Sequence, residues 1–345
     1  IPNGTMTAAG CGPMLVDPFS AQKPMRQRVF EHVRAQGSAA RSDISRALEI
    51  SPGSATTLTA ELIRTGLLRE VAQSERDHGR GRPRVALEIV PEAGFVIGVK
   101  LGDVQHTAAL SDFAGNMIAN VSLQLTLPGR PMAQIVGEVE TLISTLLEKS
   151  DMDMSDVRGI GIGMAGIIDH ENGIVHWSPL LDARDQALGS AVRARFGCHV
   201  VLENDANMLT QAELWFGLGR GKTDFAVVTI ENGVGMGLVL NNQLYRGSFG
   251  MGLELGHTKV QMDGALCRCG QRGCLEAYIS DYALAREAMT ALNVPLENKA
   301  SFQHVLETLS DEASQGNTSA CQIFRRAGRF LALGLSNIIH LFDPA

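Results

Sequence analysis

Residues Phe95–Asp112 read FVIGVKLGDVQHTAALSD, and the fold of the largest part of the chain begins with them. Two apolar runs, FVIGV and HTAAL, flank a turn that contains Gly102. Apolar runs of this length on either side of a glycine turn predict a β-hairpin. The tip of such a hairpin can hold a phosphate group, so the residues at the turn also bear on function.

Beyond this hairpin, apolar segments of strand length alternate with longer amphipathic segments. Strands are predicted at 94–101, 106–112, 117–123, 158–163, 199–203, 225–230 and 236–240. Helices are predicted at 131–149, 186–196, 206–217, 280–292, 301–314 and 318–340. Two sets of strands, each followed by helices, predict an α/β domain over 94–345. We expect its two lobes at about 94–205 and 206–330, with a cleft between them.

The residues before this domain follow another pattern. Residues 1–20 are small and polar, which predicts a flexible arm. Residues 21–90 contain three short helical patterns and then two strand patterns, GLLREV and VALEIV, an order that predicts a winged helix-turn-helix. Ser42 is a suitable N-cap for the second helix. Ser51 and Pro52 are a suitable N-cap and first residue for the third.

Charge is unevenly distributed along the chain. Residues 21–84 hold 12 basic and seven acidic residues, whereas the whole chain has a net charge of −7. A basic segment on an acidic body suggests that only the first part meets a polyanion, although charge alone leaves chance asymmetry equally open.

DNA contacts are expected from two places in this basic segment. The start of a recognition helix reaches base edges in the major groove, and arginines on a wing suit a narrow minor groove. The predicted contacts are the hydroxyl residues of the third helix and the arginines of the loop RGRPR: Ser54, Thr56, Thr57, Arg80, Arg82 and Arg84. The alternative is a winged helix that binds protein.

A metal motif lies in GHTKVQMDGALCRCGQRGC, residues Gly256–Cys274. It supplies His257, Cys267, Cys269 and Cys274. Three thiolates and one imidazole complete a tetrahedral zinc site with no open position, which indicates a structural rather than a catalytic ion. The alternative is a set of unmetallated thiols around a glycine turn.

Carboxylates and amides cluster near this motif and at the end of one predicted strand. ENDAN comprises Glu203–Asn207, LELGH contains Glu254, and CLEAY contains Glu276. Groups of this kind can accept hydrogen bonds from several hydroxyls, which is how proteins bind a sugar. Taken singly, each residue suits a helix cap or a solvated charge equally well, so the hypothesis depends on the set.

The segments GIGIGMAGIIDHENGIV, ENDAN, ELGH and CRCGQRGCLE, at this spacing, resemble the ROK family of sugar kinases and sugar-responsive repressors. The resemblance covers about 24–345 and implies an actin-like, hexokinase-like (ribonuclease H-like) pair of lobes. The winged helix resembles the repressor branch that controls N-acetylglucosamine or xylose genes, and the family's kinases lack it. Family members continue with another strand and helix, so we expect the C-terminal part to be truncated.

The resemblance also implies which residues bind sugar. The implied contacts are Gly166, Asn204, Asp205, Glu254, His257 and Glu276. Asp205 occupies the position of the general base in the kinases, and His257 would serve both sugar and zinc. Gly166 would let the backbone approach the ligand closely.

The phosphate loops depart from the kinase pattern. The kinases have Asp-x-Gly-Gly-Thr in the first hairpin, and here Lys100, Asp103 and Val104 replace the aspartate, second glycine and threonine. The second loop, Gly-Thr-Gly-x-Gly in the kinases, is ENGVG at 231–235. Asp103 and Glu231 would repel a triphosphate, and Lys100 cannot hold magnesium. We therefore expect no ATP binding and no catalytic residue.

These observations predict a sugar-responsive transcriptional regulator, most simply a repressor of carbohydrate genes that a sugar or sugar phosphate releases from its operator. Amino sugars are among the candidate ligands. Two alternatives stay open: an active sugar kinase with an added DNA-binding domain, and a regulator whose effector is a protein. Helix-turn-helix regulators bind two half-sites, so we expect a dimer or tetramer. No apolar run approaches the ~18 residues of a transmembrane helix, and no signal peptide is recognisable, so we expect a cytoplasmic protein.

Overall fold

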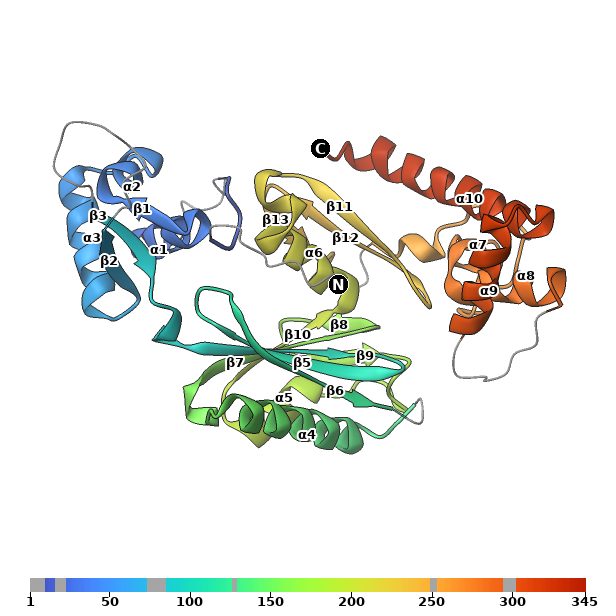
Figure 1. Ribbon diagram of the computed structural model, residues 1–345, viewed down its shortest axis with the longest axis horizontal. Coiled ribbons are helices and arrows are strands. Elements are labelled where there is room, and N and C mark those ends of the chain that lie inside the picture. Colours follow the sequence, from blue (N-terminus) through green and yellow to red (C-terminus); the bar gives the residue numbers. More distant parts are fainter. Residues whose placement is uncertain (1–9, 16–22, 73–84, 126–128, 249–252, 294–301) are drawn as a thin grey trace. The chain divides into compact units, whose positions relative to one another are not determined.

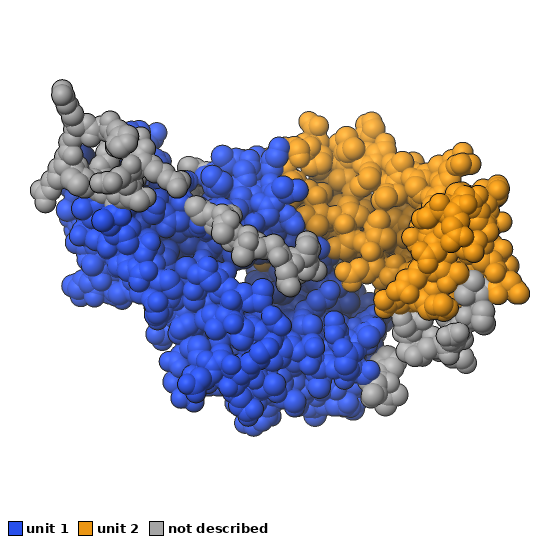
Figure 2. All heavy atoms as spheres, in the orientation of Figure 1, with its two compact units in different colours: residues 1–223, 241–243 blue, residues 224–240, 244–345 orange. Residues whose placement is uncertain are grey.

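The computed structural model describes residues 10–15, 23–72, 85–125, 129–248, 253–293 and 302–345 (Figure 1). The chain divides into two compact units, which Figure 2 distinguishes by colour. Unit 1 comprises residues 1–223 and 241–243, and unit 2 comprises 224–240 and 244–345. Among the described residues, no helix is both long enough and apolar enough to span a membrane. The three predicted wing arginines, Arg80, Arg82 and Arg84, lie outside the described residues, as does most of the predicted arm.

Residues 23–89 of unit 1 form a small helical layer with a sheet. Helices α1 (Met25–Gln36), α2 (Arg41–Ala47) and α3 (Pro52–Arg64) enclose a core that includes Val33, Ile44 and Leu62. Strands β1 (Ser38–Ala40), β2 (Leu68–Ala72) and β3 (Val85–Ile89) pair antiparallel in the order β1-β3-β2.

Two predicted caps have different outcomes. Ser51 caps α3 as predicted, since its Oγ accepts a hydrogen bond from Ser54 N at 3.0 Å and Pro52 is the first helical residue. The prediction that Ser42 caps α2 is wrong. The unpredicted strand β1 leads directly into α2, so the N-cap lies two residues earlier, at Ala40, and the helix begins at Arg41.

The α/β part of unit 1 is built on a five-stranded sheet within residues 95–204. Its strands are β4 (Phe95–Leu101), β5 (Gln105–Asp112), β6 (Met117–Gln124), β7 (Val157–Met164) and β10 (His199–Asn204). The order is β10-β7-β4-β5-β6. The opening hairpin is β4–β5, which pairs antiparallel as predicted, whereas β4 pairs parallel to β7, and β7 pairs parallel to β10.

Helices cover both faces of this sheet (Figure 1). Helices α4 (Met132–Ser150) and α5 (Leu188–Phe196) lie on one face, and α6 (Asp205–Phe216) lies on the other. Buried Ile97, Leu110, Ile143 and Leu202 belong to the core between layers. A short hairpin, β8 (Ile167–Asp169) and β9 (Ile174–Trp177), follows β7.

Unit 2 combines a small sheet with a helical layer. Strands β11 (Phe225–Ile230), β12 (Val234–Leu240) and β13 (Gln243–Tyr245) pair in this order. The helices are α7 (Glu276–Ile279), α8 (Asp281–Ala291), α9 (Gln303–Ser314) and α10 (Thr318–Phe342). Helix α6 packs against β7 and β10 and belongs to unit 1.

A buried polar cluster supports the turn of the β4–β5 hairpin. His106 is 0% exposed, and its Nδ1 accepts a hydrogen bond from Gly102 N at 3.2 Å. An acceptor Nδ1 leaves the proton on Nε2, which lies 3.2 Å from Glu138 Oε2. Arg130 donates to the same carboxylate at 2.7 Å. Burial, and then the charge of Arg130, lower the pKa of His106, so the ring stays neutral in the folded protein.

This cluster predicts a dependence of stability on pH. Because the folded-state pKa of His106 lies below its unfolded value of about 6.5, the unfolded state binds more protons as pH falls below that value. The free energy of unfolding should therefore fall with pH in this range, by at most about 1.4 kcal/mol per pH unit for this group. Urea titrations at several pH values measure the slope. The variant His106→Asn can still accept a hydrogen bond from Gly102 N and should reduce the slope of stability against pH. The control His199→Asn, which changes an exposed side chain, should leave the slope unchanged.

Candidate functional site

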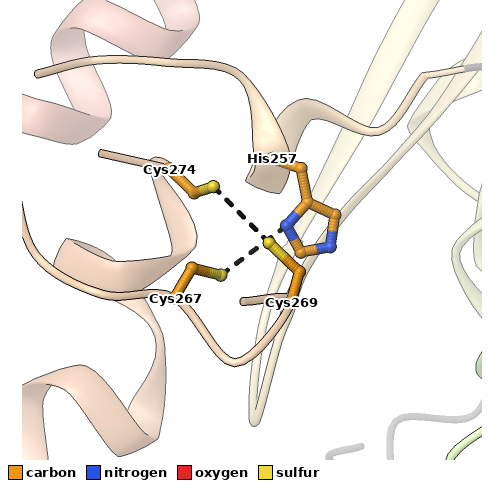
Figure 3. Close-up of side chains that lie close together, drawn as sticks. All are labelled: His257, Cys267, Cys269 and Cys274. Atoms are coloured by element: carbon orange, nitrogen blue, oxygen red, sulfur yellow. Dashed lines mark hydrogen bonds between the residues drawn. The ribbon is translucent and has the colours of Figure 1, made fainter. Parts of the chain in front are cut away.

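Four predicted metal ligands converge in unit 2 (Figure 3). His257 ends a short 3-10 helix, Leu255–His257, and Cys274 lies two residues before α7. The ligand atoms of His257, Cys267, Cys269 and Cys274 all lie within 4.8 Å of one another. The sulfurs of Cys269 and Cys274 are 3.7 Å apart, as are Cys267 Sγ and His257 Nδ1. Thiolates bound at ~2.3 Å in a tetrahedron would be about 3.8 Å apart, so the set fits one tetrahedral ion.

A tight turn brings the cysteines together. Cys267 N donates to Gln271 O at 2.8 Å, and Gly270 N donates to Cys267 O at 3.0 Å. Gly273 has φ +77°, and a Cβ at this position would lie 1.8 Å from Gln261 O, so no other residue fits. The spacing CRCGQRGC is therefore explained by the geometry of the turn.

The protonation of the thiols in this cluster depends on the charge around them. Burial raises the pKa of Cys267 to about 12, so this thiol stays protonated unless a positive charge lies nearby. Lys259 supplies one such charge, with Nζ 2.9 Å from Cys274 Sγ. A metal ion held by all four ligands would supply the rest and fix the turn, since ligands must be deprotonated to bind.

Two predicted sugar contacts adjoin the metal ligands. His257 directs Nδ1 towards Cys267, whereas its Nε2 lies 3.9 Å from Glu254 Oε2. Glu276 is buried and accepts a hydrogen bond from Val234 N at 3.2 Å. The other oxygen of Glu276 lies 3.5 Å from the hydroxyl of Tyr282. Glu276 therefore joins the start of β12 to the segment that carries the Cys and His cluster.

The other predicted sugar contacts meet in unit 1, where β10 ends and α6 begins. Asn204 Oδ1 accepts from Ala206 N at 2.9 Å and caps α6, while Asn204 Nδ2 donates to Gly166 O at 3.0 Å. Gly166 has φ +136°, and a Cβ there would lie 2.1 Å from Trp177 O. Asp205 is the first residue of α6. Gly166, Asn204 and Asp205 thus lie together.

Glu203 and His170 support this junction, and the sequence did not predict their role. Glu203 is buried, and its Oε1 accepts from Asn204 N at 2.9 Å and from Asn207 Nδ2 at 3.0 Å. The ring of His170 has Nδ1 2.8 Å from Leu202 O and 3.4 Å from Glu203 Oε2. In the sequence, the only indication of this role was that Glu203 belongs to the motif ENDAN. Its inward direction follows from strand alternation, and Asn204 and Asn207 are close to it in sequence, but its contact with His170 depends on a distant hairpin.

Several residues predicted to lie near DNA or at the phosphate loops are exposed to solvent. Ser54, Thr56 and Thr57 are exposed on α3. Asp103 and Val104 are exposed at the turn of the β4–β5 hairpin. In each phosphate loop one backbone amide already has a side-chain acceptor: Gly102 N donates to His106, and Val234 N donates to Glu276.

A protein-family model described as "ROK family" matches residues 96–345. The chain belongs to the ROK family. It is 29% identical over 309 residues to the xylose repressor of Caldicellulosiruptor bescii, covering 88% of this chain and 77% of the repressor. It is 32% identical over 265 residues to the glucokinase of Streptomyces coelicolor, covering 73% of this chain and 80% of the kinase.

Solved structures give the same family assignment. A ROK family transcriptional regulator described as a homologue of the Escherichia coli Mlc protein superposes with a TM-score of 0.75 and 26% identity. The superposition covers 92% of this chain and 80% of the regulator. The α/β part of the chain therefore has the ROK fold, which its sugar-kinase relatives share.

Proposed function

We propose that this chain is a DNA-binding transcriptional regulator, a repressor of carbohydrate genes whose affinity for its operator depends on a sugar. The observation that carries the proposal is the share of this chain that each match spans. The named repressor aligns with 88% of this chain and the regulator structure with 92%, so both matches extend beyond the ROK domain into the N-terminal helices. The glucokinase match, at 73% of the chain, is about as long as the ROK domain itself.

The N-terminal helices and sheet support a winged helix-turn-helix over residues 21–90. Helix α3 would enter the major groove, with its buried residues Ala55 and Leu62 facing the core and Ser54, Thr56 and Thr57 exposed. Arg41 holds α3 in place, since its guanidinium donates to Thr59 Oγ1 at 3.0 Å and to Glu70 at 2.7 Å. Residues 94–345 would form the effector domain, and a dimer would match an operator with two half-sites.

The wing arginines test the DNA-binding proposal. Replacing Arg80 and Arg82 with Ala should weaken operator binding and flatten the log–log salt dependence by ~0.9 for each phosphate that the protein no longer neutralises. Fluorescence anisotropy across a salt series measures both, on a duplex that the wild-type protein selects from a random library. A matched variant that replaces Arg193 and Arg195 of α5 with Ala should behave as wild type. Unchanged binding by the Arg80/Arg82 variant would contradict the role of the wing.

We expect the Cys and His cluster to hold zinc as a structural ion. The proposal is supported by the ligand set, by the separations near 3.7 Å between ligand atoms, and by the absence of an open position among four protein ligands. The ion would fix the turn that follows Glu254 and precedes Glu276, and so hold both carboxylates.

Metal analysis tests this role. Freshly purified protein should contain one zinc per chain, and Cys269→Ser should lose most of it together with sugar binding, because the segment 254–276 would lose its fixed geometry. Cys198→Ser, a thiol in unit 1, should keep the metal content unchanged. Wild-type protein without zinc would refute the assignment.

The sugar would be bound without being phosphorylated. Gly166, Asn204 and Asp205 in unit 1 and Glu254, His257 and Glu276 in unit 2 are the proposed contacts. A carboxylate that no longer removes a proton can still accept a hydrogen bond from the same hydroxyl. The phosphate loops argue against kinase activity, because Asp103 and Glu231 bring negative charge and an amide in each loop is paired with a protein side chain.

Two measurements on one preparation test this proposal. A thermal-shift screen of xylose, glucose, amino sugars and their phosphates identifies the best ligand, which calorimetry then titrates. Asp205→Ala should weaken binding by about 1.5–3 kcal/mol, as expected for removal of a charged acceptor. Asp311→Asn, an exposed change on α9, should not. ADP release with magnesium, ATP and this sugar at ~1 per second or faster would instead identify an active kinase.

A further inference from the structure

The C-terminal end of α1 is held by a residue that follows α6. Arg220 lies in the short 3-10 helix η4 (Leu218–Gly221) and is buried, with 7% of its surface exposed. Its Nη2 donates to Ala35 O, in the last turn of α1, at 2.5 Å. A cation at this end of a helix also complements the partial negative charge of the last carbonyl groups. The DNA-binding helices are thus fixed to the α/β part by a buried, charged contact.

Residues Cys11–Met14, which we call the N-terminal segment, form a bridge between the same two elements. Cys11 N donates to Arg34 O of α1 at 2.9 Å. On the other side, Gly12 N donates to Trp215 O at 2.8 Å and Met14 N donates to Arg220 O at 2.8 Å. Arg220 completes the bridge, since its Nε donates to Gly12 O at 3.0 Å. Backbone groups of α1 and of the end of α6 are therefore linked through the N-terminal segment.

Side chains add a second layer to this contact. The guanidinium carbon of Arg34 lies 4.1 Å from the centroid of the Trp215 ring, an arrangement that stabilises the cation on the aromatic face. Phe30 of α1 lies against Phe113, which follows β5, with ring centroids 5.6 Å apart. Because Trp215 is one residue from the end of α6, a shift of this helix would act directly on Arg34.

Helix α6 joins this contact to the proposed sugar site. It has 12 residues, begins at Asp205 and ends at Phe216, so it spans about 18 Å. Its N-cap Asn204 and first residue Asp205 are proposed sugar contacts. At the far end of the route, α1 contacts α3 through Arg26, whose Nε is 3.4 Å from Glu61. Direct contacts therefore connect Asp205 with the helix that would enter the major groove.

We infer that α6 transmits sugar occupancy to the DNA-binding helices, and that Trp215 and Arg220 are the residues that couple them. The inference rests on the proposed function and adds the means of regulation. A sugar that binds Asn204 and Asp205 more tightly in one position of α6 would shift the protein towards that position. The contacts of Trp215 with Arg34, and of Arg220 with Ala35, would then move α1 and α3 with it.

The test measures the operator dissociation constant with and without a sugar, using D-xylose or D-glucose, whichever stabilises the wild-type protein, and the selected duplex. In the wild-type protein the sugar should change this constant by ~5–150-fold, the usual range of such coupling. Trp215→Leu and Arg220→Met should reduce the ratio to about two-fold or less. Calorimetry without DNA should show that both variants still bind the sugar. Leu209→Ala, an exposed change in the middle of α6, should keep the wild-type ratio.

The outcomes separate this inference from the proposed function. A wild-type protein whose operator binding responds neither to these two sugars nor to the amino sugars and phosphates of the thermal-shift screen overturns the proposed function, and the coupling with it. A responsive wild type together with Trp215→Leu protein that melts cooperatively and keeps the full ratio overturns the coupling alone. Trp215 is only partly buried, so this variant decides the question even if Arg220→Met fails to fold.

Discussion

The side chain of Asn204 joins the parts of unit 1 that contain three of the proposed sugar contacts, Gly166, Asn204 and Asp205. One amide group caps α6 through Oδ1 and holds the carbonyl of Gly166 through Nδ2. The parallel strands β7 and β10 place these partners side by side, since Asn204 pairs in register with Met164, two residues before Gly166. The position of Asp205, the direction of α6 and the approach of the β8–β9 hairpin all depend on this junction. Glu203 stabilises it further by accepting from the backbone of Asn204.

In unit 2, the residues that carry the predicted site are held together mainly by turns rather than by a junction between a strand and a helix. The segment from Glu254 to Cys274 contains little regular structure, and backbone hydrogen bonds such as Val260 N to Gly273 O hold its turns together around the Cys and His cluster. Buried Leu275 and Tyr278 follow directly and pack in the main core of this unit. A metal ion bound by this cluster would therefore fix the irregular segment next to the hydrophobic core, and its binding would contribute to folding.

Much of the fold could be predicted from the sequence because apolar periodicity extends over whole elements. The predicted strand 199–203 and helix 206–217 agree within one residue with β10 and α6. The strands that were missed, such as β1 and β8, have three residues each, too short for a period to be recognisable. The clustering of His257, Cys267, Cys269 and Cys274 could be predicted because these residues are close together in the sequence. The contacts of His106 with Glu138 and of Arg34 with Trp215 join residues far apart in sequence, so no pattern along the chain could reveal them.

The hydrogen bond from Gly102 N to His106 has a consequence for how a hairpin of this kind can evolve. A loop that loses its ligand can accept substitutions inside the protein that were forbidden while the ligand was bound. Here the buried imidazole of His106 accepts the hydrogen bond from Gly102 N, and Glu138 and Arg130 pack around that imidazole. This buried network stabilises the loop in a conformation in which Gly102 N is not available to a phosphate. Restoring Asp, Gly and Thr at positions 100, 103 and 104 would change only the surface of the turn. If the chain does not bind nucleotide, as we propose, a return to a nucleotide-binding hairpin would also require changes in the core, at His106, Glu138 and Arg130.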